Sequence, residues 1–188
     1  MEKYINEYEK IFNGGDFIRN GVIMNSDEYK IFDGSSILPL INTIINDINK
    51  KLSVTILDYG CGNGSHWDKK VLDGFKTTLT EKIGCKLQSF YRYDPGKKEY
   101  NRKPSCKFDM IICTDVLEHI PLSEIPSVLK EINNYLYDDG VIYMSINTKL
   151  SSNCFINGEN MHITILEPKK WENIVKKHIN KKIKVHFT

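Results

Sequence analysis

Alanine is missing from this 188-residue sequence, and only three of its 26 basic residues are arginines. Isoleucine, asparagine and lysine are abundant instead, which is typical of the coding bias of an AT-rich genome, so the lysines alone indicate no function. A surplus of charge is also absent, because 24 acidic residues balance the basic ones, and this argues against a strongly basic nucleic-acid-binding protein. No apolar run reaches the roughly 18 residues that span a bilayer, and residues 1–10 lack the apolar stretch of a signal peptide. We therefore expect a cytoplasmic protein with no membrane partner.

Paired cysteines are missing as well. Five cysteines are present, an odd number, and none forms a C-x-x-C pair. Reduced thiols are therefore expected, and a structural zinc site is not, because such a site needs closely spaced ligands. The length suits one domain that buries roughly 70% of the surface of its unfolded chain. We expect a single domain over residues 1–188, with residues 1–50 as a helical N-terminal cap and residues 51–188 as a cofactor-binding core.

Strand patterns and helix patterns alternate in the second part of the sequence. Buried strands are predicted at 54–57, 87–93, 108–114, 141–146 and 183–187, and helices at 36–50, 121–137 and 168–178. This alternation predicts an α/β fold, a Rossmann-like three-layer sandwich around a mostly parallel sheet. Ligands of such sheets bind beyond the carboxyl ends of the strands. Three strands end at Asp58, Asp94 and Asp115, so these acids should meet at one edge.

Local signals refine the element boundaries. Ser36 is expected to cap the helix that follows it, with Pro39 tolerated in the first turn. Asp139-Gly140 predicts a turn before the strand at 141–146, and the glycines at 14, 15 and 21 should break any long N-terminal helix. Only 13 residues separate Asp94 from Phe108, and this polar segment contains Pro104, so a strand between them should be short or missing.

A glycine-rich loop, Asp58-Tyr59-Gly60-Cys61-Gly62-Asn63-Gly64, follows the first buried strand. Its glycines permit positive φ and let a ligand lie against bare backbone. The dinucleotide fingerprint G-x-G-x-x-G needs a glycine where Ser65 stands, and a phosphate-binding Walker loop needs a lysine just before that serine. An acid two residues before the first glycine also repels phosphate. The loop therefore suits a cationic ligand better than a phosphate.

These residues resemble the class I S-adenosylmethionine-dependent methyltransferases. The loop 58–64 matches their motif D/E-x-G-x-G-x-G, Tyr93-Asp94 matches the acid that ends the second strand, and residues 108–121 resemble the fourth-strand motif of the small-molecule branch. With Phe32-Asp33-Gly34-Ser35-Ser36 and residues 157–162, they resemble a bacterial and phage subgroup often associated with surface-glycan or capsule loci. The antiparallel last strand of the family would be missing here or lie beyond this sequence.

The resemblance implies S-adenosyl-L-methionine as the cofactor and S-adenosyl-L-homocysteine as the product. Carboxylates complement the cationic groups of this cofactor and accept hydrogen bonds from its ribose diol. Asp94 would hold the ribose, the glycine loop the methionine side, and Asp115 with Val116 the adenine or methyl end. The expected cofactor-binding residues are Ser36, Asp58, Gly60, Cys61, Gly62, Asp94, Pro95, Asp115 and Val116.

The candidate catalytic residues are Glu118, His119 and His162. Methyl transfer needs alignment of donor and acceptor, and a base where the acceptor is a neutral hydroxyl. His119 is either this base or a packing residue before the next helix, and His162 either contacts the acceptor or stabilises its own loop. Together with Asp115 these three could ligate a divalent ion, but nothing in the sequence fixes their distances, and no metal is expected.

Two aromatic residues have two interpretations each. Trp67, just after the glycine loop, either walls the acceptor site or packs in the core. Tyr29 precedes the first buried strand, in the region where the family folds a lid over its cofactor. It either contacts the cofactor or has no part in the site.

The resulting functional hypothesis is methylation of a small-molecule acceptor, specifically O-methylation of a sugar- or phosphate-linked precursor of a surface glycan or capsule. An RNA or protein methyltransferase that uses the lysine-rich segment 169–184 is the first alternative. A solvated helix face explains those lysines better, and no aromatic stripe for base stacking accompanies them, so nucleic acid is not an expected partner. The second alternative is a non-catalytic binding module.

Overall fold

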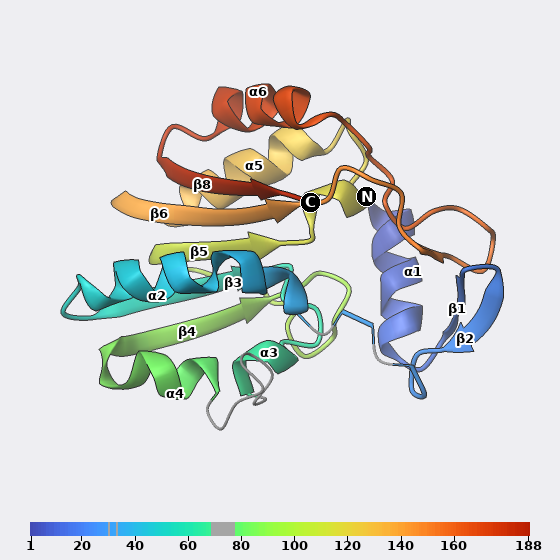
Figure 1. Cartoon of the computed structure of the whole chain (residues 1–188), viewed down its shortest axis with the longest axis horizontal. Helices are drawn as coiled ribbons and strands as arrows, with labels where there is room; N and C mark the ends of the chain where they lie inside the picture. The colour runs from blue at the N-terminus through green and yellow to red at the C-terminus, as the bar shows by residue number, and fades with distance from the viewer. Residues whose placement is uncertain (30, 33, 69–77) are drawn as a thin grey trace.

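A computed structural model describes residues 1–29, 31–32, 34–68 and 78–188, and its centre is a five-stranded sheet (Figure 1). The strand order is β4-β3-β5-β6-β8, and every neighbouring pair is parallel. The carboxyl ends of all five strands therefore lie at one edge. The strands are β3 (Val54–Tyr59), β4 (Leu87–Tyr93), β5 (Phe108–Thr114), β6 (Leu136–Ile146) and β8 (Lys182–Phe187). The predicted α/β, Rossmann-like fold is confirmed.

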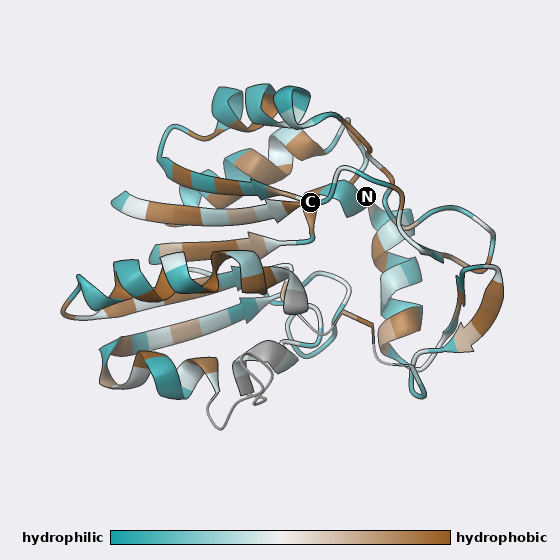
Figure 2. Cartoon of the chain, viewed as in Figure 1, coloured by the Kyte–Doolittle hydropathy of each residue, from teal (hydrophilic) through white to brown (hydrophobic). Residues whose placement is uncertain are grey.

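Helices cover both faces of this sheet, and Figure 2 shows apolar residues along the strands and on one side of the helices. Neighbouring strand residues point to opposite faces, so Leu57 and Ile111 pack with Trp171 in one core, whereas Ile56 and Met110 pack in the other. The first core is covered by α5 (Ile125–Asn134) and α6 (Pro168–His178), the second by α2 (Ile41–Asn49) and α4 (Leu79–Ile83). Shorter helical segments are η1 (Ser35–Leu40), α3 (Ser65–Asp68), η2 (Gly84–Lys86) and η3 (Leu117–His119).

The N-terminal cap, residues 1–29, lies beside the carboxyl edge of the sheet (Figure 1). It contains α1 (Glu2–Phe12) and the hairpin of β1 (Asp16–Arg19) and β2 (Val22–Asn25), which pairs with β7 (Asn153–Cys154) in the order β2-β1-β7. Residues 1–50, expected as a helical cap, contain α1, η1 and α2 but also this hairpin, which was not predicted. The hairpin is closed by Asn20-Gly21, whose φ angles of 50° and 81° form its two-residue turn.

Several predicted boundaries moved. Ser36 is not a helix cap, because η1 begins after Gly34 in the left-handed region and no side chain caps it. Helix 36–50 divides into η1 and α2, since Pro39 lacks the N–H that a continuous α-helix needs. Asp139-Gly140 does not reverse the chain but lies inside β6, where the register with β5 shifts and accommodates the extra residues.

The predicted loss of a strand between β4 and β5 is confirmed, because residues 94–107 form neither strand nor helix. In the described part of the chain, Cys61 and Cys113 are buried free thiols, whereas Cys85 and Cys106 are exposed ones. Among the described residues, no helix combines the length and the apolar character needed to cross a membrane.

Candidate functional site

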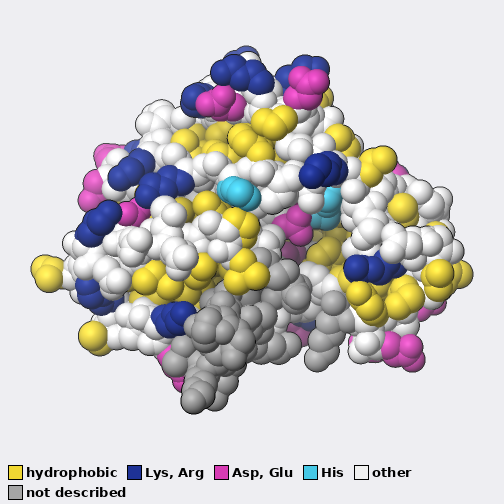
Figure 3. Space-filling model, in the orientation of Figure 1, with side chains coloured by type: hydrophobic (Ala, Val, Ile, Leu, Met, Phe, Trp, Pro, Cys, Tyr) yellow, Lys and Arg dark blue, Asp and Glu magenta, His cyan; other side chains and the backbone are white. Residues whose placement is uncertain are grey.

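A cavity of about 370 Å³ lies at the carboxyl ends of β3, β4 and β5, between the sheet and α1. Figure 3 shows acidic and histidine side chains next to one another in the hollow between these two parts of the molecule. Of the candidate catalytic residues, His119 lines the cavity, whereas Glu118 and His162 do not. All nine predicted cofactor-binding residues line it, namely Ser36, Asp58, Gly60, Cys61, Gly62, Asp94, Pro95, Asp115 and Val116.

The glycine loop is fixed by the end of β4. The backbone N–H groups of Gly60 and Cys61 both donate to the Tyr93 carbonyl oxygen, at 2.7 and 3.1 Å. Gly60 has a φ of 74°, and a Cβ atom there would lie 2.4 Å from Cγ2 of Val116. Glycine is therefore required at position 60, because φ is positive there and because a Cβ atom has no room beside Val116. Burial raises the pKa of the neighbouring Cys61 thiol and so disfavours its nucleophilic thiolate form.

Asp94 joins the glycine loop to the turn after β4. Its Oδ2 accepts the N–H of Gly62 and its Oδ1 accepts the N–H of Gly96, both at 2.9 Å. Burial raises the pKa of this carboxyl to about 6, although the two N–H donors oppose the shift. Each oxygen keeps a lone pair that can accept a further hydrogen bond. The carboxylate can therefore hold two neighbouring hydroxyls.

Asp58 is buried at the end of β3, where the indole Nε1 of Trp67 donates to its Oδ2 at 2.6 Å. The Trp67 ring is fully buried and lies 4.1 Å from the Phe90 ring, measured between centroids. The core-packing interpretation of Trp67 is thus confirmed. This tryptophan orients the Asp58 carboxylate and does not itself reach the cavity.

The backbone after β5 is strained. Asp115 has a φ of 61°, an unusual value for a residue other than glycine, and its N–H donates to the Ser145 carbonyl oxygen at 2.9 Å. Such strain persists where surrounding structure enforces it, and it is concentrated at functional sites. On the preceding residue, the Thr114 hydroxyl accepts a hydrogen bond from Ser36 at 3.3 Å. The contact ties η1 to the floor of the cavity.

Helix α1 closes the cavity with an aromatic face. Tyr4, Tyr8 and Phe12 follow one another at a spacing of four residues, so they share one side of the helix and line the cavity together. These residues were not predicted, although their four-residue spacing is visible in the sequence. Tyr29 does not line the cavity, because its ring packs near Phe17 instead.

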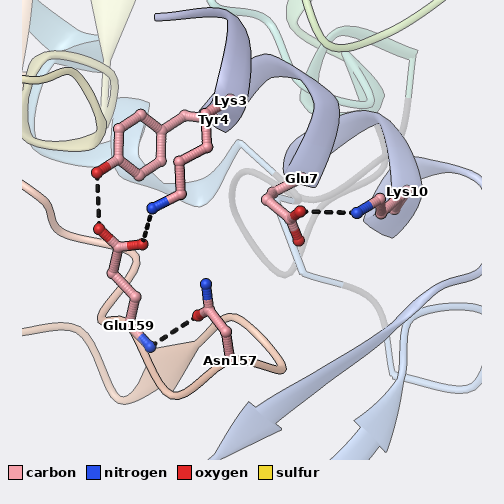
Figure 4. Close-up of polar contacts among 6 residues, drawn as sticks. All are labelled: Lys3, Tyr4, Glu7, Lys10, Asn157 and Glu159. Atoms are coloured by element: carbon pink, nitrogen blue, oxygen red, sulfur yellow. Dashed lines mark hydrogen bonds and ion pairs between the residues drawn. The ribbon is translucent and has the colours of Figure 1, made fainter.

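An ion pair and a hydrogen bond hold α1 on the loop after β7 (Figure 4). Glu159 accepts a hydrogen bond from the Tyr4 hydroxyl and pairs with the Lys3 ammonium, each at 2.6 Å. Its own N–H donates to Oδ1 of Asn157 at 2.9 Å. These bonds lower the pKa of Glu159, with the hydrogen bond from Lys3 as the largest cause. The ionised carboxylate therefore helps to keep α1 over the cavity.

Tyr8 and His119 meet under α1. The Tyr8 hydroxyl lies 2.6 Å from Nδ1 of His119 and donates to the Met161 carbonyl oxygen at 3.2 Å. Burial lowers the pKa of His119 to about 4, so its ring is neutral near pH 7. Burial raises the pKa of Tyr8, and the charge of Asp115 adds to this effect. Neither group accepts a proton readily, and this environment does not favour His119 alone as a general base.

His162 lies behind His119, with the two ring centroids 4.9 Å apart. It is 7% exposed, and its Nδ1 lies 2.6 Å from the Lys149 carbonyl oxygen. This is the loop-stabilising hydrogen bond that the sequence left open as one alternative. The second alternative, contact with an acceptor, is indirect at most in this conformation, because His162 does not line the cavity.

Glu118 is fully buried and links η3 to the end of β6. Its Oε1 accepts the N–H of Asn147 at 2.5 Å. Burial, reinforced by the nearby charge of Asp115, raises its pKa well above the usual range. The geometry therefore gives Glu118 a structural position outside the cavity lining, and its catalytic role stays a prediction.

The model of one protein family, described as Methyltransferase domain, matches residues 31–180. This range contains the glycine loop, Asp94, Asp115 and the loop with His162, whereas α1 and the hairpin lie outside it. Asp33, part of the motif at 32–36, falls outside the described residues. No curated protein matches the chain.

Proposed function

Because the chain belongs to the methyltransferase domain family, we propose that it transfers a methyl group from S-adenosylmethionine to an oxygen atom of a small-molecule acceptor. Enzymes of this family typically depend on that cofactor. The acceptor we propose is a sugar- or phosphate-linked precursor of a surface glycan or capsule, by the resemblance of residues 32–36 and 157–162 to a subgroup associated with such loci.

The cavity fits the cofactor in size and charge. Its volume of about 370 Å³ falls within the usual range for small-molecule sites. Asp58, Asp94 and Asp115 give it an acidic lining that complements the sulfonium and amino groups of the cofactor. In this proposal, the Asp94 carboxylate accepts the two ribose hydroxyls while the glycine loop lies against the methionine part.

The bound cofactor supplies an electrophilic methyl group on its sulfonium, so the protein mainly has to align the acceptor and exclude water. The aromatic face of α1 covers the cavity, and Tyr8 and His119 provide polar atoms beside it. Asp115, which follows β5, lines the same cavity. These residues would orient the acceptor oxygen toward the methyl group.

The closure by α1 is the observation that favours a small acceptor. Residues of α1, of the glycine loop and of α5 line one cavity together, so a ligand in it is enclosed from several sides. A nucleic acid would have to place a single flipped base in such a space.

The lysine-rich segment gives the RNA or protein alternative little support. Lys169 and Lys176 pair with Glu172, Lys181 pairs with Asp138, and Lys184 pairs with Asp47. Partly neutralised lysines on an exposed face are typical of a solvated surface. A steep fall of RNA affinity with rising salt would support this alternative over our proposal.

Calorimetry with the purified chain tests the cofactor part of the proposal. We expect S-adenosylmethionine and S-adenosylhomocysteine to bind at micromolar dissociation constants, about −8 kcal/mol. A screen of sugar and sugar-phosphate acceptors with a radiolabelled methyl donor then tests the reaction. Label in any small-molecule product eliminates the non-catalytic alternative, whereas the absence of cofactor binding would overturn the proposal itself.

A further inference from the structure

Three side chains from separate segments converge beside the cavity. Asp115 follows β5, His119 ends η3, and His162 lies in the loop after β7. Each offers one carboxylate oxygen or ring nitrogen, and these three atoms lie within 4.8 Å of one another. A carboxylate and two imidazoles at such distances are a possible ligand set for a metal ion.

The backbone fixes the orientation of both imidazole rings. Nδ1 of His119 lies 2.9 Å from the Met161 carbonyl oxygen, and Nδ1 of His162 lies 2.6 Å from that of Lys149. A carbonyl oxygen can only accept, so each Nδ1 carries the hydrogen, and each Nε2 keeps its lone pair. Histidines that ligate metals are held in this way, with the second ring nitrogen bonded to a carbonyl or carboxylate oxygen.

Two atoms near this cluster are buried without a hydrogen-bond partner among the described residues. They are Nε2 of His119 and Oε2 of Glu118. The Glu118 side chain is fully buried, and the Asp115 carboxylate is one of the three clustered groups. In the part of the chain that the structure describes, neither carboxyl forms an ion pair with a lysine or arginine. A cation is therefore the electrostatic complement of this cluster.

We propose that Asp115, His119 and His162 bind one divalent first-row transition-metal cation at the wall of the cavity. Two imidazoles and one carboxylate favour Mn²⁺, Fe²⁺, Co²⁺ or Zn²⁺ over Mg²⁺ and Ca²⁺, which prefer oxygen ligands alone. Around a bound ion with metal–ligand bonds of about 2.1 Å, the ligand atoms would lie roughly 3–3.5 Å apart. Small side-chain movements would bring the three ligand atoms to these distances. Three protein ligands leave positions open for a ligand oxygen.

The bound cation would supply a chemical role that the protein side chains lack. This role rests on the proposed function. An acceptor hydroxyl on the cation has a lowered pKa and loses its proton to solvent without a strong base. The acceptor oxygen then forms its bond to the methyl carbon, the carbon–sulfur bond breaks, and its electron pair stays on sulfur. The acceptor class is thus an alcohol or diol that can coordinate a metal.

Binding of Mn²⁺ to the untagged, chelator-stripped chain tests the site without cofactor or acceptor. Free Mn²⁺ is followed by electron paramagnetic resonance, and Mn²⁺ is chosen because it favours oxygen and nitrogen ligands over the exposed thiols of Cys85 and Cys106. We expect one ion per chain, and a loss of affinity of about tenfold or more in His162→Ala. His178→Ala, which alters a histidine outside the cluster, should bind Mn²⁺ like the parent chain.

Asp115→Asn is the second variant, because asparagine tolerates the positive φ of this position and so preserves the fold. It should also lose Mn²⁺ affinity by about tenfold or more. Absence of saturable binding, or equal affinity of both variants and the parent, overturns the site. If Mn²⁺ binds but the cofactor does not, the proposed function fails and the site stands. If the cofactor binds and methyl transfer occurs but Mn²⁺ does not bind saturably, the site fails and the proposed function stands. Methyl transfer that survives chelation overturns the role of the cation in the reaction.

Discussion

At the scale of single residues, Gly60 is the position where conformation and packing act together. Its φ of 74° strains any other residue, and a Cβ atom would overlap the Val116 side chain. We expect Gly60→Ala to lower the free energy of unfolding by about 2–5 kcal/mol and to weaken cofactor binding. Denaturant unfolding and calorimetry measure the two effects.

Gly21 provides the matched control, because it has a φ of 81° with open space where a Cβ atom would lie. Gly21→Ala therefore carries conformational strain without a clash, and its loss should be about 1 kcal/mol. Adding Val116→Ala to Gly60→Ala removes the overlap and should recover part of the stability. Equal losses at the two glycines would contradict the role of the Val116 contact.

If the proposed function holds, Asp94 should make cofactor affinity depend on pH. Its ionised form would accept the ribose hydroxyls, and burial raises its pKa to about 6. Affinity is therefore full above that value and falls as the pH drops through it, by about tenfold between pH 7 and pH 5. Calorimetry across this range should show the decline in the parent chain.

Asp94→Ala should weaken cofactor binding at least tenfold at pH 7, by about 1.5–3 kcal/mol, and should abolish the pH dependence. Asp139→Ala is the control, because Asp139 is an exposed acid of β6 that does not line the cavity. It should keep both the affinity and its pH profile. An Asp94→Ala chain that binds like the parent would show that the ribose lies elsewhere.

Sequence reasoning at this scale succeeded where the backbone alone decides the position. The three strand-end acids and the glycine loop all reach the cavity, because parallel strands bring their carboxyl ends to one edge. The sequence did not indicate that the Glu118 side chain turns into the core toward Asn147. The direction of a side chain depends on contacts from distant segments, and a motif does not contain them.

At the scale of elements, Glu159 is one of the residues that hold α1 on the loop after β7 (Figure 4). We expect Glu159→Gln to loosen α1, so that amide hydrogen exchange in residues 4–12 becomes faster while the sheet is unchanged. The Glu159 pKa is lowered in the folded chain, so its contribution is present above the usual carboxyl pKa and is lost as the pH falls through the lowered value. Exchange measured at pH 7 therefore shows the full effect.

Glu7→Gln is the matched control for this contact. Glu7 also lies on α1, but it pairs with Lys10 of the same helix at 2.7 Å and not with the loop. Its loss should change local exchange only slightly, since exposed pairs within one helix contribute about 0.3–0.5 kcal/mol. Equal acceleration in both variants would indicate a general effect of charge on α1.

The elements themselves were predictable where their pattern was long and periodic. The core strands followed from continuous apolar runs, and the missing strand between β4 and β5 from a short polar segment with Pro104. The hairpin of the cap was missed although Asn20-Gly21 is a strong hairpin signal. The turn predicted at Asp139-Gly140 was wrong, because pairing on β5 keeps that segment extended.

At the scale of the whole molecule, the cap and the sheet build the cavity jointly. The family match begins at residue 31, yet Tyr4, Tyr8 and Phe12 of the preceding segment line the same space as Asp94. The sequence predicted at which edge of the sheet the cofactor should bind, but not that α1 closes the cavity there. The contact between α1 and His119 joins residues 111 positions apart, and no local pattern indicates it. Pairing of β1 with β7 fixes the cap to the same loop.

Cofactor binding should therefore stabilise the cap and the sheet as one unit. At a cofactor concentration of 100 times its dissociation constant, the folded state gains about 2.7 kcal/mol, which raises the melting temperature by about 5–10 °C. Hydrogen exchange should slow both at the ends of β3 and β4 and in α1, because the ligand contacts both sides of the cavity. Asp94→Ala at the same cofactor concentration should show less protection on both sides. Protection confined to residues 54–116 would mean that α1 does not close on the cofactor, and α1 would then not enclose a small acceptor.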